Sequence, residues 1–375
     1  MEPRPFPVRQ CLPRKTLKGN HTLNEIVDVD VLIVGAGPAG LCTACACEDR
    51  GLTSVVVDRA GLAQSFSEYP HNLQFFSPPG EMEIGGVPLP VAGGLKPTRE
   101  TYLAYLRGVA RSTKINLQTW TAITACKRQD NGSFLAATKS RPTGLDGPRI
   151  HACGIVLATG VWNSPNRLGV PGEEMPHIIH ELADPTPYFD CGVVVIGGGN
   201  SAVGGALTLM EAGANVALSM RRPPKNYRCG LRPFVKRDLG FAVDEGRIRL
   251  HDNTVVREIL PDRVILEPVR YTGSEDLTEG QMSDYENTGE QFELPARFVF
   301  ALIGHRPDET FLRDIIGLDL RHDGRPACDL GSWETPARNI FLAGSLADPS
   351  IDIILKLREQ AADVVDTLAT RLRNV

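Results

Sequence analysis

Two short glycine-rich stretches are the residues of this sequence whose spacing most directly indicates chemistry. The first reads GAGPAG from Gly35 to Gly40, and the second reads GGGNSA from Gly197 to Ala202. Each follows an apolar run and precedes a stretch rich in small, helix-compatible residues. N–H groups at the start of a helix lack intrahelical partners, and together with the helix dipole they bind anions such as a pyrophosphate. The chain therefore predicts two dinucleotide-binding turns.

The three glycines of the first turn have separate roles in such a site. Gly35 permits the sharp turn, Gly37 leaves room for the pyrophosphate, and Gly40 lets the helix pack closely on the strand. An acidic residue is expected about 20 residues further on, at the end of the second strand, where it binds the ribose hydroxyls. Asp58 occupies that position.

The second turn differs where its second strand ends. Gly197 and Gly199 match the first two glycines, and Ala202 takes the third place, which the fingerprint tolerates. The stretch NVALSMRR ends in Arg221 and Arg222, not in an acid. Guanidinium groups bind a 2′-phosphate that an acid would repel, so this site is predicted to prefer NADPH over NADH. The alternative interpretation of the pair is a solvated basic turn.

Opposite electrostatics at the two turns predict two different dinucleotides, a permanently bound FAD at the first and an exchangeable NADPH at the second. A flavin takes a hydride from a nicotinamide and passes electrons on singly or in pairs.

Hydrophobic patterning places both turns in α/β units. Continuous apolar runs indicate strands buried on both faces of a parallel sheet. The expected elements are strands at 30–34, 53–57, 154–160, 297–308 and 339–345, helices at 41–50, 98–112 and 352–373, antiparallel strands over 114–152, a loop-rich stretch at 68–97 and a second nucleotide unit at about 190–222. Thr98 is the expected helix cap.

Bulk composition excludes several classes of protein. Hydrophobic residues make up 42% and charged residues 23% of the chain, which is ordinary for a globular enzyme. A net charge of −5 gives no reason to expect nucleic acid or an acidic membrane as a partner. The basic, proline-rich N-terminus lacks the apolar segment of a signal peptide, and the nine cysteines show no disulfide-framework spacing. A cytoplasmic location with reduced thiols is expected.

From about residue 28 to its end, the chain resembles the two-dinucleotide-binding-domain flavoproteins of the thioredoxin-reductase-like group. The resemblance rests on VGAGPAG, on GIVLATG at 154–160, on VIGGGNSA and on ALIGHRPD at 301–308. Within that group the chain resembles the bacillithiol-disulfide (bacilliredoxin) reductases in YPHNLQFFS, EIGGVPLP, KPTRETYLAYLRGVA, VPGEEMPHIIHELADPTPYFD and RPDETFL.

This resemblance implies an α/β fold of two Rossmann-like, three-layer domains. An N-terminal arm at 1–27 would precede an FAD-binding domain at 28–168 and 298–375, with an NAD(P)H-binding domain at 169–297 inserted between its halves. Together with the glycine turns, it implies FAD contacts at Gly35, Gly37, Pro38, Ala39, Gly40, Asp58, Ala158, Thr159, Gly160, Gly344 and Ser345. The NADPH contacts would be Gly197, Gly199, Asn200, Ser201, Ala202, Arg221 and Arg222.

Three departures from the group bear on the chemistry. No Cys-x-x-Cys lies between residues 190 and 299, where thioredoxin reductases carry one. Bacillithiol reductases usually place a cysteine in the slot of Ala39, and alanine cannot form a mixed disulfide. The usual Ala-Gly-Asp near the C-terminus reads Ala-Gly-Ser here, ending at Ser345.

The candidate catalytic residues are Cys42, Cys45, His71 and His305. Cys42 and Cys45 form a C-x-x-C at the start of a helix, which lowers a thiol pKa, but small buried cysteines in a packed helix are the favoured interpretation. His71 lies in a loop with Tyr69, Asn72, Phe75 and Phe76 that the resemblance brings close to the flavin, with loop packing as the alternative.

Four further residues flank the nucleotide units. His305 lies where the chain is expected to re-enter the FAD domain, on the route toward the flavin, and Trp162 is expected to pack against the edge of the cofactor. His177 and His180 have no third ligand at useful spacing, so no metal is expected.

The sequence therefore predicts an FAD-dependent NAD(P)H oxidoreductase. NADPH would reduce the flavin, which would pass electrons to a small-molecule acceptor, such as a disulfide, or to a redox protein, without a Cys-x-x-Cys relay. Two alternatives stay open: a monooxygenase that uses NADPH and oxygen, and a non-catalytic redox sensor or assembly subunit. The resemblance also implies a homo-oligomer.

Overall fold

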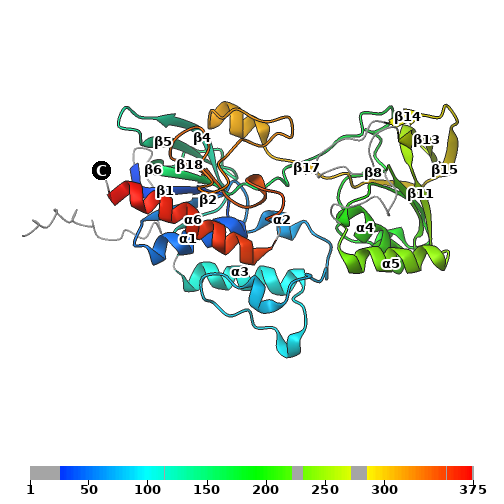
Figure 1. Cartoon of the computed structure of the whole chain (residues 1–375), viewed down its shortest axis with the longest axis horizontal. Helices are drawn as coiled ribbons and strands as arrows, with labels where there is room; N and C mark the ends of the chain where they lie inside the picture. Colours follow the sequence, from blue (N-terminus) through cyan, green and yellow to red (C-terminus); the bar gives the residue numbers. More distant parts are fainter. Residues whose placement is uncertain (1–25, 114, 222–230, 272–284, 352, 374–375) are drawn as a thin grey trace, which may run out of the picture.

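The computed structural model describes residues 26–113, 115–221, 231–271, 285–351 and 353–373. Two α/β lobes lie side by side and are joined by two crossing segments near β17 (His305–Arg306) (Figure 1). The larger lobe contains both ends of the described chain, and the smaller lobe is formed by the middle of the sequence. This arrangement confirms the predicted fold of two nucleotide-binding domains.

A seven-stranded sheet forms the larger lobe, with the order β3-β2-β1-β6-β5-β4 and β18 paired to β6. The pairs among β3, β2, β1, β6 and β18 are parallel, whereas β4, β5 and β6 pair antiparallel. Its strands are β1 (Ile26–Val34), β2 (Ser54–Val57), β3 (Leu117–Gln118), β4 (Thr121–Arg128), β5 (Phe134–Ser140), β6 (Arg149–Leu157) and β18 (Ile340–Leu342).

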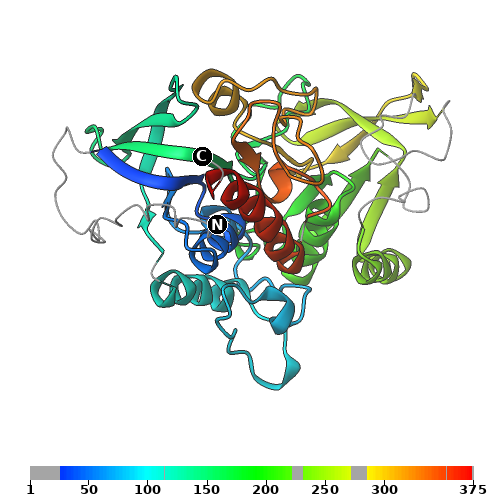
Figure 2. The same cartoon turned by 60° about the vertical axis from the view of Figure 1, so that its left-hand side comes forward.

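One face of this sheet is covered by α1 (Pro38–Asp49) and α6 (Ile354–Arg373), which lie against each other although they come from opposite ends of the chain (Figures 1 and 2). The core beneath them includes Val31, Ile33 and Val156, all fully buried. The strands β1, β2 and β6 bury side chains on both faces, because helices cover one face and the 311–347 region covers the other.

Helix α3 (Arg99–Ser112) packs below α1 and begins where the sequence predicts. The Thr98 side chain accepts a hydrogen bond from the backbone N–H of Thr101 at 3.3 Å, as expected of an N-cap. Between β2 and α3 the chain forms only α2 (Gln64–Ser67) and short 3₁₀ turns, which confirms the loop-rich interpretation of 68–97.

The smaller lobe repeats the nucleotide unit. Its parallel sheet has the order β11-β10-β9-β16-β8, and a second, antiparallel sheet packs beside it. Its elements are β8 (Ile178–Ile179), β9 (Gly192–Ile196), α4 (Asn200–Glu211), β10 (Asn215–Met220), α5 (Pro233–Asp244), β11 (Ile248–Asp252), β12 (Thr254–Leu260), β13 (Arg263–Tyr271), β14 (Tyr285–Asn287), β15 (Phe292–Pro295) and β16 (Phe298–Ala301).

Two expected domain boundaries differ from the sheet topology. β16 pairs with β9 in the second sheet, so residues 298–301 belong to the smaller lobe and not to the FAD domain. The reason is that β16 pairs with β9 in the smaller lobe in the same way that β6 pairs with β1 in the larger lobe. The chain returns to the larger lobe at β17, which pairs with β7 (Ser164–Pro165). β1 begins at Ile26, two residues inside the expected arm.

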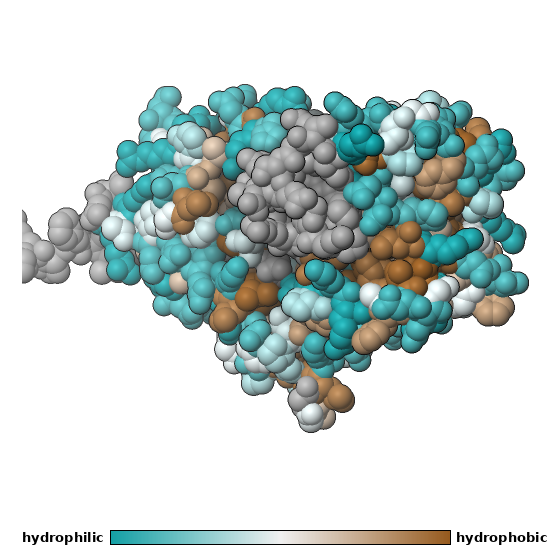
Figure 3. Space-filling model, turned by 45° about the vertical axis from the view of Figure 1, so that its right-hand side comes forward, coloured by the Kyte–Doolittle hydropathy of each residue, from teal (hydrophilic) through white to brown (hydrophobic). Residues whose placement is uncertain are grey.

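The surface is mostly hydrophilic on the face shown in Figure 3, where hydrophobic residues gather in a band beside the grey region. Large exposed hydrophobic side chains include Phe76, Leu95 and Phe241. The Phe76 ring contacts the Phe234 ring of the other lobe at a centroid distance of 4.7 Å. Among the described residues, no helix is both long and apolar enough to cross a membrane.

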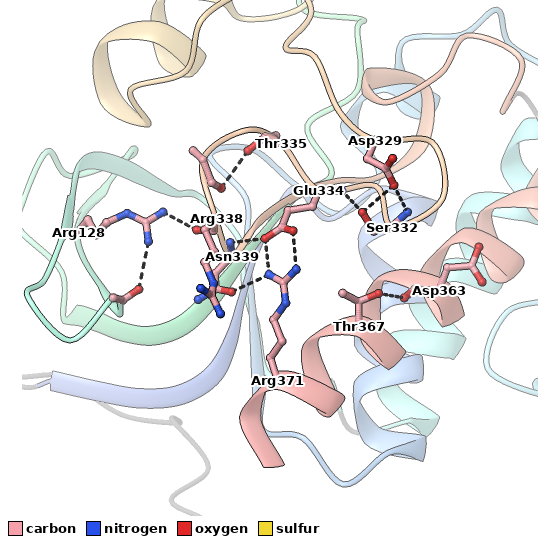
Figure 4. Close-up of polar contacts among 12 residues, drawn as sticks. Arg128, Asp329, Ser332, Glu334, Thr335, Arg338, Asn339, Asp363, Thr367 and Arg371 are labelled. Carbon is pink, nitrogen blue, oxygen red and sulfur yellow. Dashed lines mark hydrogen bonds and ion pairs between the residues drawn. The ribbon is translucent and has the colours of Figure 1, made fainter. Parts of the chain in front are cut away.

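A polar network fixes the C-terminal helix to the larger lobe (Figure 4). Arg371 of α6 makes a bidentate ion pair with Glu334, and its Nη1 donates to Asn339 Oδ1 at 3.0 Å. Glu334 Oε1 also accepts the backbone N–H of Asn339 at 2.7 Å. The Arg371 guanidinium therefore holds the pKa of the Glu334 carboxyl below its ordinary value.

We expect Glu334→Gln to lower the free energy of unfolding by about 1–3 kcal/mol at pH 7, because it weakens a mostly buried, charge-assisted pair. A carboxyl whose pKa is lowered on folding stabilises the fold above its unfolded-state pKa of about 4.3, and that contribution is lost as the pH falls through the folded pKa. Urea unfolding should therefore show the difference between wild type and variant shrinking as the pH falls below about 4.

The matched control is Asp262→Asn, which removes the partner of Arg263 in an exposed ion pair. This substitution should change the free energy of unfolding by less than about 1 kcal/mol. A Glu334→Gln effect that stays constant from pH 7 to pH 3 would contradict the assigned role of the pair.

Candidate cofactor and active site

The first glycine turn is shaped by a close contact with the next strand. Gly35 has φ +112°, and a Cβ placed on it would lie 2.3 Å from the carbonyl oxygen of Ala158. A Cβ on Gly40 would lie 1.9 Å from the Gly35 oxygen. Only glycine fits at these two positions, so strand, turn and helix pack as closely as the fingerprint requires.

Gly37 is different, because the space beside it is open. A Cβ there would meet nothing within 4 Å, and its φ of −80° is ordinary. Helix α1 starts at the next residue, Pro38, with no side-chain cap and no acid in its first turn. The first N–H groups of α1 therefore face an open, uncompensated space, which fits a pyrophosphate.

Asp58 lies at the end of β2, where a ribose-binding acid is expected. Its Oδ2 accepts the N–H of Ala36 at 2.7 Å, and its Oδ1 accepts the N–H of Ala60 at 2.8 Å. These bonds fix the carboxylate against the turn, and each oxygen keeps a lone pair for a ribose hydroxyl. Beside it, the buried Gln118 Nε2 has no partner in the described part of the chain.

Two other turns of the larger lobe lie next to each other, close to the first glycine turn. Gly160 and Gly344 have φ of +66° and +71°, and a Cβ on Gly160 would lie 3.8 Å from Ser345 Oγ. Gln360 of α6 accepts the N–H of Gly344 at 2.7 Å through Oε1. The buried Gln360 Nε2 and Thr159 Oγ1 have no partner among the described residues. Such unmet groups fit a polar cofactor that would complete their hydrogen bonds.

The second turn reproduces the first. Gly197 has φ +135°, and a Cβ on it would lie 2.4 Å from the carbonyl oxygen of Leu302, which follows β16 as Ala158 follows β6. Gly199 meets nothing within 4 Å, and α4 begins after it without a side-chain cap or an acid in its first turn. Ala202 is fully buried. The residues of this turn therefore fit a second pyrophosphate.

Residues around the second turn are partly engaged with the protein itself. Asn200 Oδ1 accepts the N–H of Arg232 at 3.0 Å, which ties the start of α4 to the segment before α5. Ser201 is exposed on the first turn of α4. Arg221 is an exposed residue directly after β10, as predicted, while Arg222 lies outside the described residues.

The structure places the candidate thiols in the core. Cys42 and Cys45 are 4% and 7% exposed, and neither forms a disulfide. Burial raises the pKa of the Cys42 thiol far above its ordinary value and that of Cys45 to about 11. At neutral pH both are protonated and weakly nucleophilic, which favours the packing interpretation.

The histidines divide into surface and interior groups. The His71 side chain is 61% exposed, and its Nδ1 lies 3.1 Å from Arg99 Nη1. His180 Nε2 lies 3.0 Å from Arg167 Nη1. Within the described ranges, no three His, Cys, Asp or Glu side chains gather in a way that could hold a metal.

His305 lies in the interior, at the junction of the two lobes. Its side chain is 5% exposed, its ring stacks on Trp162 at 4.0 Å, and its Nε2 lies 3.0 Å from Glu181 Oε1. Tyr69 contacts the other side of this group, with its ring edge-on to Trp162 at 5.5 Å. The structure thus brings together His305, Trp162 and Tyr69 but leaves His71 on the surface.

Sequence reasoning missed three polar residues of this region. Gln360 carries a signal, because it is a polar residue on the apolar stripe of α6, between Leu357 and Ala361. Gln118 and Glu181 carry no such signal in the sequence, because the residues they contact, Asp58 and His305, lie far away along the chain.

The fold and the two open turns define a flavoprotein with two dinucleotide-binding domains. Residues 32–344 match the pyridine nucleotide-disulphide oxidoreductase family. The chain is 29% identical over 323 residues to bacilliredoxin reductase Bdr of Bacillus subtilis (strain 168), covering 86% of this chain and 91% of that protein.

Solved structures show the same likeness. Bacillithiol disulfide reductase Bdr (YpdA) from Bacillus cereus matches with a TM-score of 0.79 and 30% identity, covering 92% of this chain and 99% of the other. A flavin monooxygenase from Stenotrophomonas maltophilia matches with a TM-score of 0.72 at 18% identity over 92% and 99% of the two chains, which shows a shared fold.

The chain belongs to the pyridine nucleotide-disulphide oxidoreductase family. It is an FAD-dependent oxidoreductase, and the resemblance to the thioredoxin-reductase-like group is confirmed. FAD and NADPH are the cofactors of this family and its relatives, so the predicted pair is confirmed at that level. The individual contact residues stay predictions.

We expect Gly37→Ala to fold normally but to lower FAD affinity at least about tenfold, because its methyl group occupies space that the pyrophosphate needs. The added Cβ meets no protein atom, so the melting temperature of the apoprotein should not change. Flavin absorbance after gel filtration measures the effect.

Gly108→Ala in α3 is the matched control, since its Cβ also meets nothing within 4 Å, and it should keep its flavin. Gly199→Ala should keep FAD but lose affinity for the pyridine nucleotide. Wild-type FAD affinity in Gly37→Ala would refute the assignment of the first turn.

Proposed function

We propose that this protein transfers electrons from NADPH through bound FAD to a small disulfide, without a cysteine relay. When bound, FAD accepts a hydride from the nicotinamide and passes two electrons on. The balanced reaction is NADPH + H⁺ + RSSR → NADP⁺ + 2 RSH. The proposal depends on two helices that begin after Gly37 and Gly199, each without a side-chain cap and beside open space. The second strand of the first unit is followed by an acid, Asp58, and that of the second unit by a base, Arg221.

Residues at the strand ends support the assignment of cofactors to turns. Asp58 is fixed by two backbone N–H groups with its remaining lone pairs available, which suits ribose hydroxyls. Arg221, exposed at the end of β10, offers a positive charge where the second dinucleotide would carry its 2′-position. FAD at the first turn and NADPH at the second follow from this difference.

Two considerations support a small disulfide as the acceptor. The relatives that match most of the chain are named for bacilliredoxin and bacillithiol disulfide reduction. The described thiols near the first turn are buried, and Ala39 stands at its helix start, so none of these thiols is available there to relay electrons. A disulfide would therefore have to meet the flavin directly.

The test is anaerobic turnover of the purified holoenzyme with NADPH and bacillithiol disulfide. We expect multiple turnovers, and the Cys42→Ala/Cys45→Ala double variant should retain the wild-type rate within about twofold, because both thiols are protonated core groups. Abolished turnover in a folded, flavin-loaded double variant would show a thiol relay. No disulfide turnover in the wild type would refute the acceptor.

The same purified holoenzyme distinguishes the monooxygenase alternative from the proposed disulfide reductase. Aerobic NADPH oxidation that inserts oxygen into an added amine or thioether would favour it, whereas hydrogen peroxide release without a modified substrate would not. A protein that performs one turnover at most with every acceptor would be the sensor or assembly subunit.

Nucleotide preference is tested with the arginine pair. Arg221→Leu/Arg222→Leu should lower kcat/KM for NADPH by about 10–100-fold, which corresponds to the loss of one charge-assisted bond of about 1.5–3 kcal/mol, and should leave kcat/KM for NADH nearly unchanged. Arg237→Leu, which removes an exposed arginine of α5, is the control and should preserve the preference. An unchanged NADPH-to-NADH ratio in the double variant would favour the solvated-turn interpretation.

A further inference from the structure

A buried histidine lies where the chain crosses between the two domains. The outgoing segment carries Trp162 and Glu181, and the returning segment carries His305. β7 and β17 pair antiparallel at this crossing, with His305 opposite Pro165. The crossing therefore fixes the backbone on both sides of the His305 ring.

Two contacts determine how the ring is held. His305 stacks on Trp162 with a centroid distance of 4.0 Å and an interplanar angle of 21°. Its Nε2 lies 3.0 Å from Glu181 Oε1, and since a carboxylate only accepts, Nε2 carries the hydrogen. This bond fixes the tautomer and leaves Nδ1 to act on something else.

His305 Nδ1 is buried and has no hydrogen-bond partner among the described residues. The indole Nε1 of Trp162, in the same stack, is likewise buried and without a partner there. Trp162 follows the flavin-site turn at Gly160 by two residues, and Tyr69 closes the stack from the side. Unmet buried polar groups that converge beside a cofactor turn mark a place where a polar ligand completes their hydrogen bonds.

Glu181 connects this interior group with water. Its side chain is 39% exposed, whereas that of His305 is 5% exposed. The Glu181 carboxylate thus reaches the ring from the solvent side, on the nitrogen opposite the buried Nδ1.

We propose that His305, as an imidazolium with a hydrogen on each ring nitrogen, donates the Nδ1 proton to the acceptor and is left as the neutral ring with Nε2–H on Glu181. Glu181 is the positioning residue that orients the ring. This inference rests on the proposed function. In the reaction, the S–S bond breaks and two S–H bonds form; NADPH supplies two electrons and one proton as a hydride, and His305 supplies the second proton, which water replaces. Cys42 and Cys45 are buried core groups, so neither of them supplies that proton.

The experiment compares two electron acceptors on the holoenzyme. Bacillithiol disulfide requires protons, whereas ferricyanide takes up electrons alone. His305→Gln should lower kcat with the disulfide by about 10–100-fold, the range expected for loss of a proton donor, with KM changed less than about threefold. Turnover with ferricyanide should stay within about twofold of wild type, because hydride transfer to the flavin does not use this proton.

Glu181→Gln should lower disulfide kcat less than His305→Gln, and Glu181→Asp should restore part of the loss. The matched controls are His322→Gln and Glu174→Gln, which change an exposed histidine and an exposed glutamate. Both should leave kcat unchanged with the disulfide and with ferricyanide. His305→Ala leaves a space beside Trp162, and added imidazole should recover disulfide turnover in that variant.

A readout without turnover uses histidine labelled with ¹³C at Cε1. The NMR signal that disappears in His305→Gln should shift when bacillithiol disulfide is added to the oxidised holoenzyme, while the His322 signal should not. Flavin content and visible spectrum of every variant report whether the fold and the cofactor site are intact.

Equal losses with disulfide and ferricyanide, or no rescue by imidazole in a flavin-loaded variant, would show a structural role and overturn the inference. Wild-type disulfide rates in His305→Gln would overturn it as well. A wild-type enzyme that reduces ferricyanide but not the disulfide would instead refute the proposed function, and the inference with it.

Discussion

In each domain the first glycine of the turn lies against the carbonyl that directly follows a neighbouring strand, β6 in one domain and β16 in the other. A Cβ would lie 2.3 Å from Ala158 O in one case and 2.4 Å from Leu302 O in the other. Any side chain would push the turn away from the strand, and the helix that follows would start elsewhere. The contact thus sets where α1 and α4 begin, and hence where their free N–H groups point.

The same constraint explains how one scaffold distinguishes two cofactors. Both turns place an open space at the second glycine and a helix without a cap behind it, so the pyrophosphate sites are alike. The difference lies at the end of the second strand, outside the constrained contact. Asp58 is fixed there by two N–H groups in the first domain, whereas Arg221 is exposed there in the second. In the proposed assignment, cofactor specificity is therefore carried by Asp58 and Arg221, which lie outside the constrained contact.

Local patterns in the sequence predicted the features that depend on local geometry. The strand–turn–helix units around Gly35 and Gly197, the Thr98 cap and the position of Asp58 follow from spacing and residue type. The boundary at 298 was wrong because an apolar strand does not show which sheet it joins; only its pairing with β9 decides that.

Contacts between distant residues were beyond such reasoning. Glu181 and His305 are 124 residues apart, and Gln360 reaches Gly344 only because α6 packs back across the first turn. The sequence alone does not distinguish His71 from His305 as a catalytic candidate. Burial does, because the side chain of His71 is 61% exposed and that of His305 is 5% exposed.

Burial also explains why Cys42 and Cys45 are not suited to a dithiol relay. A thiol relays electrons only if it ionises at neutral pH, and the desolvation that packs Cys42 and Cys45 into the core raises the pKa of both. Helix α1, whose first N–H groups are proposed to bind the pyrophosphate, therefore carries thiols that serve as small apolar side chains. Ala39 at its first turn supplies no nucleophile. Proton handling then has to come from outside this helix, and the crossing between the domains is where a buried imidazole and an exposed carboxylate meet.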